Sequence, residues 1–333
     1  AQVIPSGKLP KYSYIPELNE KIAEMVAGLN SGQVFLVNQA QGFNWQDYTV
    51  HDKVHPNKAG AEKMATVWFE ALKKVLASSE TVFSPEIVRY KTLEDGDSLA
   101  LHIFKPRNMQ AGEKRPAIVY FFGGGWKLGT PIQFYRECAY YASKGMVAVS
   151  VDYRIGYLHH STPFESFEDA KDAICWLRSH ASDYQLDPDK IAVAGGSAGG
   201  HLAAALGTIG SDETVPAGYR PNLSVLYYPV IDMVSRGYGF PEIKRDFEKI
   251  SPIHHVSEAT PSTLILLGTK DPIVSVETIE AYQDKLLQKG VDCELHLFEG
   301  AGHPIFLYRK PLTEEYYKVR KLTDDFLKRQ GFL

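Results

Sequence analysis

The chain has 333 residues, a length that suits two domains or one large α/β domain with an extra segment. Hydrophobic residues make up 44% and charged residues 23%, which excludes a disordered or fibrous chain. With 36 Lys and Arg against 40 Asp and Glu, the net charge is −4, so we expect no nucleic-acid and no anionic-membrane partner. No apolar run reaches the roughly 18 residues that a transmembrane helix needs.

The first 79 residues contain few elements. Residues 15–29 and 58–77 have apolar side chains at helical spacing, and residues 33–38 are predicted to form a short strand. Serine and proline then interrupt the apolar pattern between residues 78 and 85, so we divide the chain into 1–79 and 80–333. Such a small segment has a thin core, and pairing of two chains through it would cover its apolar side chains.

After residue 80, strands and helices alternate, which predicts a mostly parallel sheet with helices on both faces. The central strands are continuously apolar, as expected for burial on both sides. The predicted strands are 86–91, 98–104, 117–122, 146–151, 191–194, 223–228, 263–267 and 293–298. The predicted helices are 131–144, 166–182, 198–209, 276–289 and 312–330. Residues 231–261 are predicted to form a small lid.

The three cysteines, Cys138, Cys175 and Cys293, are widely spaced and form no CxxC pair. An odd number without paired spacing argues against a disulfide framework or a zinc site, so we expect buried free thiols and no metal. A large core can do without disulfides, so the redox compartment stays open.

A GxSxG element, Gly195-Gly196-Ser197-Ala198-Gly199, lies between a predicted strand and a predicted helix. This position is typical of a nucleophile elbow, in which small residues permit a strained turn and the serine hydroxyl projects above the sheet. The alternative is a phosphate-binding turn at a helix N-terminus. Neither GxGxxG nor GxxxxGK[ST] accompanies the element, so we favour Ser197 as a nucleophile and expect no cofactor.

A serine nucleophile needs a base and an orienting carboxylate, which follow it in the order Asp and then His in such sheets. Asp271 follows the strand at 263–267, and His303 follows the strand at 293–298 in a glycine-rich loop. Both therefore lie at the strand ends where these sheets place their sites. The oxyanion needs backbone N–H donors. We expect them from Ala198 and from the glycine run, with Gly124 as first choice and Gly125 as second.

In combination, these motifs resemble an α/β-hydrolase esterase of the hormone-sensitive-lipase-like or bacterial carbohydrate acetyl esterase kind. The resemblance covers residues 80–333 and rests on Phe121-Phe122-Gly123-Gly124-Gly125-Trp126, Asp152-Tyr153-Arg154, the GxSxG element, Asp271 and His303. The family often has His before the three glycines, where this chain has Phe122, which leaves open what organises that loop.

The N-terminal segment carries a second resemblance. Asp52-Lys53-Val54-His55-Pro56-Asn57 is similar to the C-terminal block of SGNH/GDSL hydrolases, in which Asp and His serve a serine near the start of the domain. No Gly-Asp-Ser precedes it, so we expect residues 1–79 to be a partial, non-catalytic SGNH-like segment.

Several further residues are candidate substrate contacts. Trp126 beside the glycine run is a candidate for stacking on a sugar, with core packing as the alternative, and His159 and His160 lie in the loop after the fourth strand. In the lid, Tyr238 and Phe240, together with Phe247, are candidate pocket walls. Arg154 is expected in a buried salt bridge.

The residues and resemblances together predict a serine ester hydrolase that forms an acyl-enzyme on short-acyl esters, with acetylated carbohydrate as the expected substrate. The location would then be periplasmic or secreted, and otherwise cytoplasmic. The alternatives are a general carboxylesterase, a serine peptidase or amidase, and a non-catalytic carbohydrate-binding relative.

Overall fold

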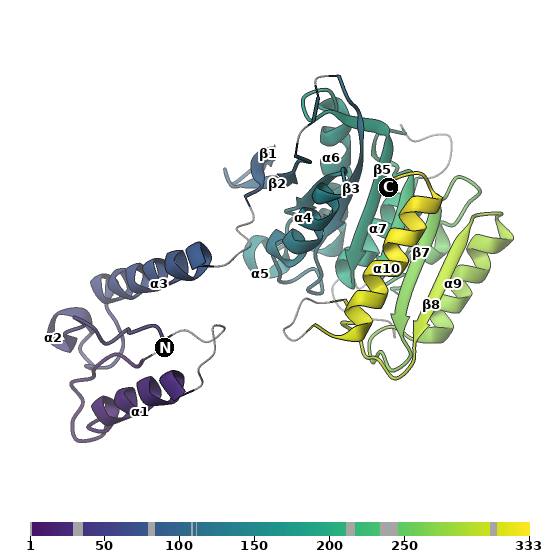
Figure 1. Ribbon diagram of the computed structural model, residues 1–333. Coiled ribbons are helices and arrows are strands. Elements are labelled where there is room, and N and C mark those ends of the chain that lie inside the picture. The colour runs from purple at the N-terminus through teal and green to yellow at the C-terminus, as the bar shows by residue number, and fades with distance from the viewer. Residues whose placement is uncertain are drawn as a thin grey trace. The chain divides into compact units, whose positions relative to one another are not determined.

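The computed structural model describes residues 2–28, 36–78, 84–107, 109–110, 112–210, 217–233, 246–306 and 312–333. The chain divides into two compact units, Ala1–Val82 and Phe83–Leu333 (Figure 1). No helix in these ranges is long and apolar enough to cross a membrane.

The first unit contains the helices α1 (Ile15–Gly28), α2 (Trp45–Tyr48) and α3 (Lys58–Ser78). Residues 36–38, at the end of the predicted strand 33–38, form no strand, and residues 33–35 lie outside the described ranges. Among its described residues, the buried hydrophobic side chains are Ile15, Val37 and Phe43. Trp68, Phe69 and Leu72 on α3 are instead 42%, 61% and 51% exposed, so this unit by itself has a very small core.

The second unit is built on one eight-stranded sheet with the order β1-β2-β4-β3-β5-β6-β7-β8. The strand β2 pairs antiparallel with β1 and with β4, and all other pairs are parallel. The strands are β1 (Glu86–Thr92), β2 (Ser98–Phe104), β3 (Arg115–Phe121), β4 (Val147–Val151), β5 (Leu186–Gly196), β6 (Leu223–Tyr227), β7 (Ser262–Gly268) and β8 (Cys293–Phe298). Apart from the start of β5, these strands agree with the predicted ones to within two residues.

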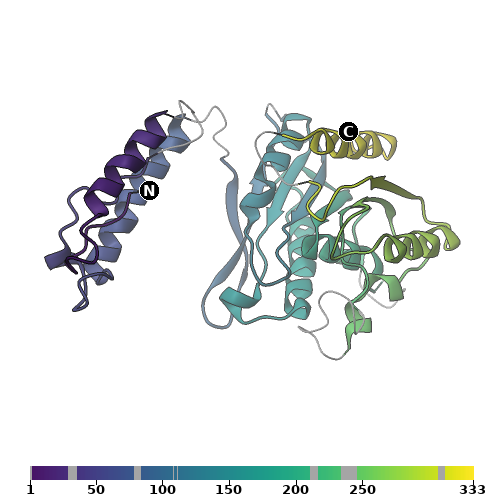
Figure 2. The same cartoon turned by 90° about the horizontal axis from the view of Figure 1, so that it is seen from below.

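Helices cover both faces of this sheet (Figures 1 and 2). They are α4 (Tyr135–Ser143), α5 (Gly156–His159), α6 (Pro163–Ser179), α7 (Ala198–Thr208), α9 (Val276–Gln288) and α10 (Glu314–Arg329), and the short 3-10 turns are η1 (Pro131–Phe134), η2 (Ala217–Tyr219), η3 (Phe247–Ile250) and η4 (Pro252–His254). Hydrogen bonds from Tyr140 to Asp324 (2.5 Å) and from Tyr316 to Glu137 (2.7 Å) join α4 to α10. The turns η3 and η4 are what the structure describes of the predicted lid, beside residues 231–233 and 255–261.

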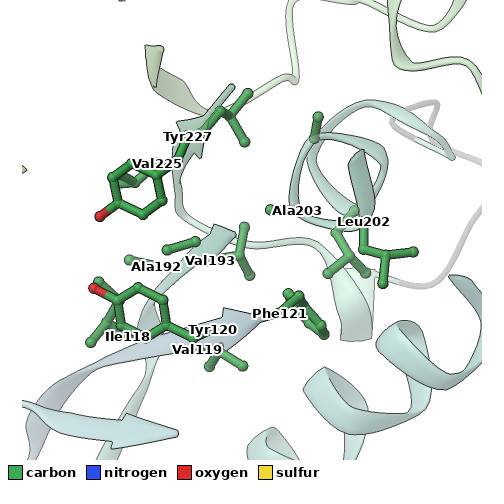
Figure 3. Packing of buried hydrophobic residues seen from close by; sticks show 14 of the residues in the cluster. Ile118, Val119, Tyr120, Phe121, Ala192, Val193, Leu202, Ala203, Val225 and Tyr227 are labelled. Carbon is green, nitrogen blue, oxygen red and sulfur yellow. The ribbon is translucent and has the colours of Figure 1, made fainter. Parts of the chain in front are cut away.

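The core lies between the central strands and these helices. Figure 3 shows Tyr120 of β3 and Tyr227 of β6 on one side of the strands and Leu202 and Ala203 of α7 on the other. All four side chains have no exposed surface. Burial on both faces explains why the central strands are continuously apolar in the sequence.

The helix α6, the start of β5 and the burial of one cysteine differ from the predictions. The helix α6 begins at Pro163, not 166, because Thr162 and Glu165 form a capping box at its start, and it ends at Ser179, not 182. The strand β5 begins at Leu186, which pairs with Arg115 beyond a bulge. All three cysteines are free, but Cys175 is exposed on α6, whereas Cys138 and Cys293 are buried as predicted.

Candidate active site

Ser197 stands at the sharp turn between β5 and α7. Its backbone has φ 57° and ψ −118°, a region that a non-glycine residue occupies only where the surrounding structure enforces it. The turn requires close packing, because a Cβ added to Gly199 would lie 2.0 Å from the carbonyl oxygen of Phe121. The elbow geometry therefore depends on glycine at this position.

The side chains of Ser197, His303 and Asp271 form one hydrogen-bonded row. His303 Nε2 lies 2.8 Å from Ser197 Oγ, and His303 Nδ1 lies 2.6 Å from Asp271 Oδ2. Because a carboxylate only accepts, Nδ1–H donates to Asp271, which leaves Nε2 as the acceptor for the serine hydroxyl. The three residues lie 106 and 32 positions apart in the chain, yet the strand ends bring them together.

Asp271 is held in a single orientation. Its side chain has no exposed surface, and its Oδ1 accepts the backbone amides of Ile273 (2.8 Å) and Val274 (2.9 Å). These bonds fix one carboxylate oxygen, so that Oδ2 points at His303. The imidazole is itself 13% exposed, so the pair is nearly closed to water.

The glycine run lies beside the elbow. A Cβ on Gly123 would come within 2.8 Å of the Gly196 carbonyl oxygen and 3.4 Å of Ser197 Cβ. Gly124 and Gly125 have φ of 143° and 62°, backbone conformations that favour glycine. Within the described ranges, the amides of Gly124, Gly125 and Ala198 have no acceptor in the protein, whereas the amide of Gly123 donates to Gln133 Oε1 at 2.6 Å.

Gln133 and Tyr153 hold the glycine loop, which begins after Phe122. The Tyr153 hydroxyl donates to the carbonyl oxygen of Phe122 at 2.6 Å, and the two rings stack with centroids 4.1 Å apart. Gln133 holds the loop through Gly123, from η1 ten residues downstream. Gln133 was not predicted, because nothing in a lone glutamine indicates which backbone group it contacts.

Trp126 does not present its ring to a substrate. It is 1% exposed, and its Nε1 donates to Nδ1 of His201 (3.3 Å), whose Nε2–H donates to the carbonyl oxygen of Ile250 (2.6 Å). Burial lowers the pKa of His201 to about 4, so this histidine is neutral at pH 7. Stacking of Trp126 on a sugar is therefore wrong, and core packing is correct.

Of the two candidate histidines after β4, the structure turns His159 away from a substrate. The His159 side chain is 7% exposed and its Nδ1 accepts the Ile155 amide at 3.0 Å, so the ring caps its own loop and is not offered to a substrate. His160 is exposed and closes α5 in the left-handed conformation, with φ 52°. Tyr238 and Phe240 lie outside the described residues, whereas Phe247 is partly buried against the core.

Arg154 is part of a buried ion-pair cluster, as predicted. It binds Asp169 through Nε (2.8 Å) and Nη2 (2.8 Å), and Lys91 Nζ lies 2.6 Å from the same carboxylate. Asp169 has no exposed surface, so this cluster fixes α6 against the loop that follows β4. Burial raises the pKa of the neighbouring Asp152 to about 6.

Asp52 and His55 of the first unit also form a pair, with Nδ1 2.5 Å from Oδ2. The hydrogen bond from His55 and two backbone amides hold the pKa of Asp52 well below its usual range. The His55 side chain is 77% exposed. Among the described residues, no group of three or more His, Cys, Asp or Glu side chains is placed to hold a metal ion.

The mostly parallel sheet, the elbow at the end of β5 and the row of three side chains define an α/β-hydrolase fold. The family model BD-FAE matches residues 101–245. Thermogutta terrifontis esterase 2, solved with propionate bound, is 37% identical with a TM-score of 0.69, over 75% of this chain and 95% of that one. The chain therefore belongs to the α/β-hydrolase esterase family.

Two curated relatives are similar over shorter parts. The esterase LipC of Mycobacterium tuberculosis is 28% identical over 241 residues, which are 63% of this chain and 57% of that protein. The acetylxylan esterase of Xylanibacter ruminicola is 26% identical over 227 residues, or 63% and 44%. The chain thus spans about half the length of these relatives.

Proposed function

We propose that the protein is a serine carboxylic-ester hydrolase that works through an acyl-enzyme. The observation that carries this proposal is the row from Ser197 Oγ through His303 to Asp271, with distances of 2.8 and 2.6 Å. In this arrangement a neutral imidazole accepts the serine proton while the carboxylate holds its tautomer.

The reaction then follows in two halves. His303 Nε2 takes the proton of Ser197 as Oγ attacks the ester carbonyl, and Asp271 stabilises the imidazolium that forms. The imidazolium returns the proton to the leaving alcohol, and the bond from acyl carbon to alkoxy oxygen breaks. Water, deprotonated by the same base, attacks the acyl-enzyme and releases the acid and Ser197.

The oxyanion is bound by backbone amides. We assign Ala198 and Gly124 as donors, with Gly125 as the alternative to Gly124, because these amides have no protein acceptor within the described residues. Gly123 is not a donor, since its amide is already bonded to Gln133. Ala198 is also the first residue of the eleven-residue helix α7, whose positive end favours the developing negative charge.

Short-chain esters are the proposed substrates, with acetylated carbohydrate foremost. Solved structures of Thermogutta terrifontis esterase 2 with propionate and with butyrate bound support a short acyl group, and the similarity to an acetylxylan esterase supports a carbohydrate alcohol. Acetate release from acetylated xylan, compared with release from p-nitrophenyl acetate, tests the carbohydrate part. If no acetylated glycan releases acetate, the protein is a general carboxylesterase.

The test of the mechanism is Ser197→Ala. We expect this variant to keep its fold and to lose turnover of p-nitrophenyl acetate by about 10⁴-fold or more, because the nucleophile is gone. Ser224→Ala is the matched control: this buried serine of β6 lies against Gly207, and its removal should leave turnover unchanged. Normal turnover by folded Ser197→Ala would disprove the mechanism.

A serine peptidase is the second candidate, because the acylamino-acid-releasing enzyme of Arabidopsis thaliana is 28% identical over 235 residues, 62% of this chain and 30% of that protein. An acetylated amino-acid anilide assayed beside p-nitrophenyl acetate separates the two. Ester hydrolysis without amide hydrolysis would exclude the peptidase.

A further inference from the structure

The end of β6 and the segment that follows it hold the backbone of Ser197 on both sides. The Tyr227 carbonyl oxygen accepts the Ser197 amide at 3.0 Å, and the Val230 amide donates to the Ser197 carbonyl oxygen at 3.4 Å. Between them, the Tyr228 amide donates to the carbonyl oxygen of Leu266 at 2.7 Å and so ties the segment to β7. Tyr228 is therefore fixed to the nucleophile elbow and to the strand that leads to Asp271.

The Tyr228 ring fills the space between the elbow and the base. It meets the imidazole of His303 at an angle of 64°, with ring centroids 4.8 Å apart. On the elbow side, a Cβ added to Gly196 would lie 2.7 Å from the Tyr228 hydroxyl oxygen and 2.9 Å from Cζ. The residue is 4% exposed, so the ring keeps water from this side of the imidazole.

The backbone of Tyr228 is unusual for so large a residue. Its φ of 39° lies in the left-handed region, where a bulky side chain is disfavoured. Such strain persists only where surrounding contacts enforce it, and here the three backbone hydrogen bonds of the segment do so. The strained conformation directs the ring at His303, whereas the Tyr227 side chain before it packs with Phe306 and lies near Thr323.

Two hydrogen bonds hold the imidazole of His303 at its two nitrogens, and Cβ joins the ring to the backbone. The Tyr228 ring packed against the imidazole further limits rotation of the His303 side chain about its bonds. We propose that Tyr228 is a positioning residue, which holds the His303 ring in line between Asp271 and Ser197 during proton transfer. This inference rests on the proposed ester hydrolysis.

The experiment compares Tyr228→Leu, Tyr228→Phe and the wild type on p-nitrophenyl acetate, with rates given per active site titrated by a fluorophosphonate. Because the contact matters in the transition state, we expect Tyr228→Leu to lower kcat and kcat/KM by about tenfold with KM changed less than twofold. Tyr228→Phe keeps the ring and should restore both. Tyr282→Leu, the same change at a buried tyrosine of α9, should leave kcat per titrated site unchanged.

Three outcomes would overturn the inference. Tyr228→Leu at the wild-type kcat would show that the ring is dispensable, and Tyr228→Phe as slow as Tyr228→Leu would show that the ring contact is not the cause. A raised KM with unchanged kcat would make Tyr228 a substrate contact. In contrast, a wild-type protein that does not hydrolyse p-nitrophenyl acetate would count against the proposed function itself.

Discussion

Burial of Asp152 and burial of His201 make the stability of the folded protein change with pH in opposite directions. Burial raises the pKa of Asp152 from 3.8 to about 6, so its ionised form costs stability above that pH. Burial lowers the pKa of His201 from 6.5 to about 4, so the folded protein loses stability as the pH falls below about 6.5. Asp152 therefore lowers the stability of the folded protein at neutral pH, and His201 lowers it in acid.

Asp152→Asn should make the folded protein more stable at neutral pH. The folded pKa of Asp152 lies above its unfolded value, so its stability contribution is lost as the pH rises from about 4 to about 6. We expect the variant to be more stable than the wild type by up to ~3 kcal/mol at pH 8, with the difference vanishing towards pH 4. Calorimetry at several pH values measures it, and an equal gain at pH 4 and pH 8 would contradict the explanation.

Residues at strand ends were predictable, whereas buried contacts were not. Ser197, Asp271 and His303 were found because each follows a recognisable strand and their order in the chain is informative. Trp126 and His159 are residue types that often contact substrates, but both are buried in the fold, and this burial cannot be seen in the sequence. Tyr228 was predicted only as the end of a strand, since its φ and its neighbours are tertiary properties.

At the scale of elements, the link from β5 through the elbow to α7 decides whether the site forms. Gly199→Ala should lower the free energy of unfolding by about 1–3 kcal/mol and slow ester hydrolysis, because the new Cβ would lie 2.0 Å from a backbone oxygen that cannot move aside. In Gly218→Ala the new Cβ meets Cys175 Sγ at an ordinary 3.5 Å, so this control should change stability by less than about 0.5 kcal/mol. Thermal unfolding with parallel rate measurements compares them, and equal losses would show that glycine at 199 is not a steric requirement.

The boundaries of elements were predicted less well than their existence. The strand β5 begins five residues before its apolar run, because Leu186 pairs with Arg115 across a bulge while Asp-Pro-Asp-Lys at residues 187–190 gives no strand signal. The start of α6 was marked in the sequence by Thr162, Pro163 and Glu165, the pattern of a capping box. Of the predicted strand 33–38, the structure describes residues 36–38, and these form no strand.

At the scale of the whole molecule, the two units differ greatly in what they bury. All three residues of the row at Ser197 belong to Phe83–Leu333, which also contains its own core. We therefore expect a protein shortened to residues 83–333 to fold and to hydrolyse p-nitrophenyl acetate within a few-fold of the full chain. Circular dichroism and kinetics test this. A folded but inactive shortened protein would show that residues 1–82 take part in the site.

The partial SGNH-like assignment of residues 1–79 and the pairing of chains through them remain predictions. Pairing of two chains would cover the exposed side chains of Trp68, Phe69 and Leu72. Sedimentation of the full and shortened proteins measures whether either one forms pairs.

The thiols have a practical consequence. Partial or full burial raises the pKa of all three cysteine thiols, but Cys175 is exposed, whereas Cys138 and Cys293 are buried and out of reach of reagents. A maleimide dye at mildly alkaline pH should thus attach once per molecule, at a known position on α6. The natural sequence offers a single chemical handle for immobilisation or fluorescence, and oxidised stocks should contain disulfide-linked pairs that a reductant separates.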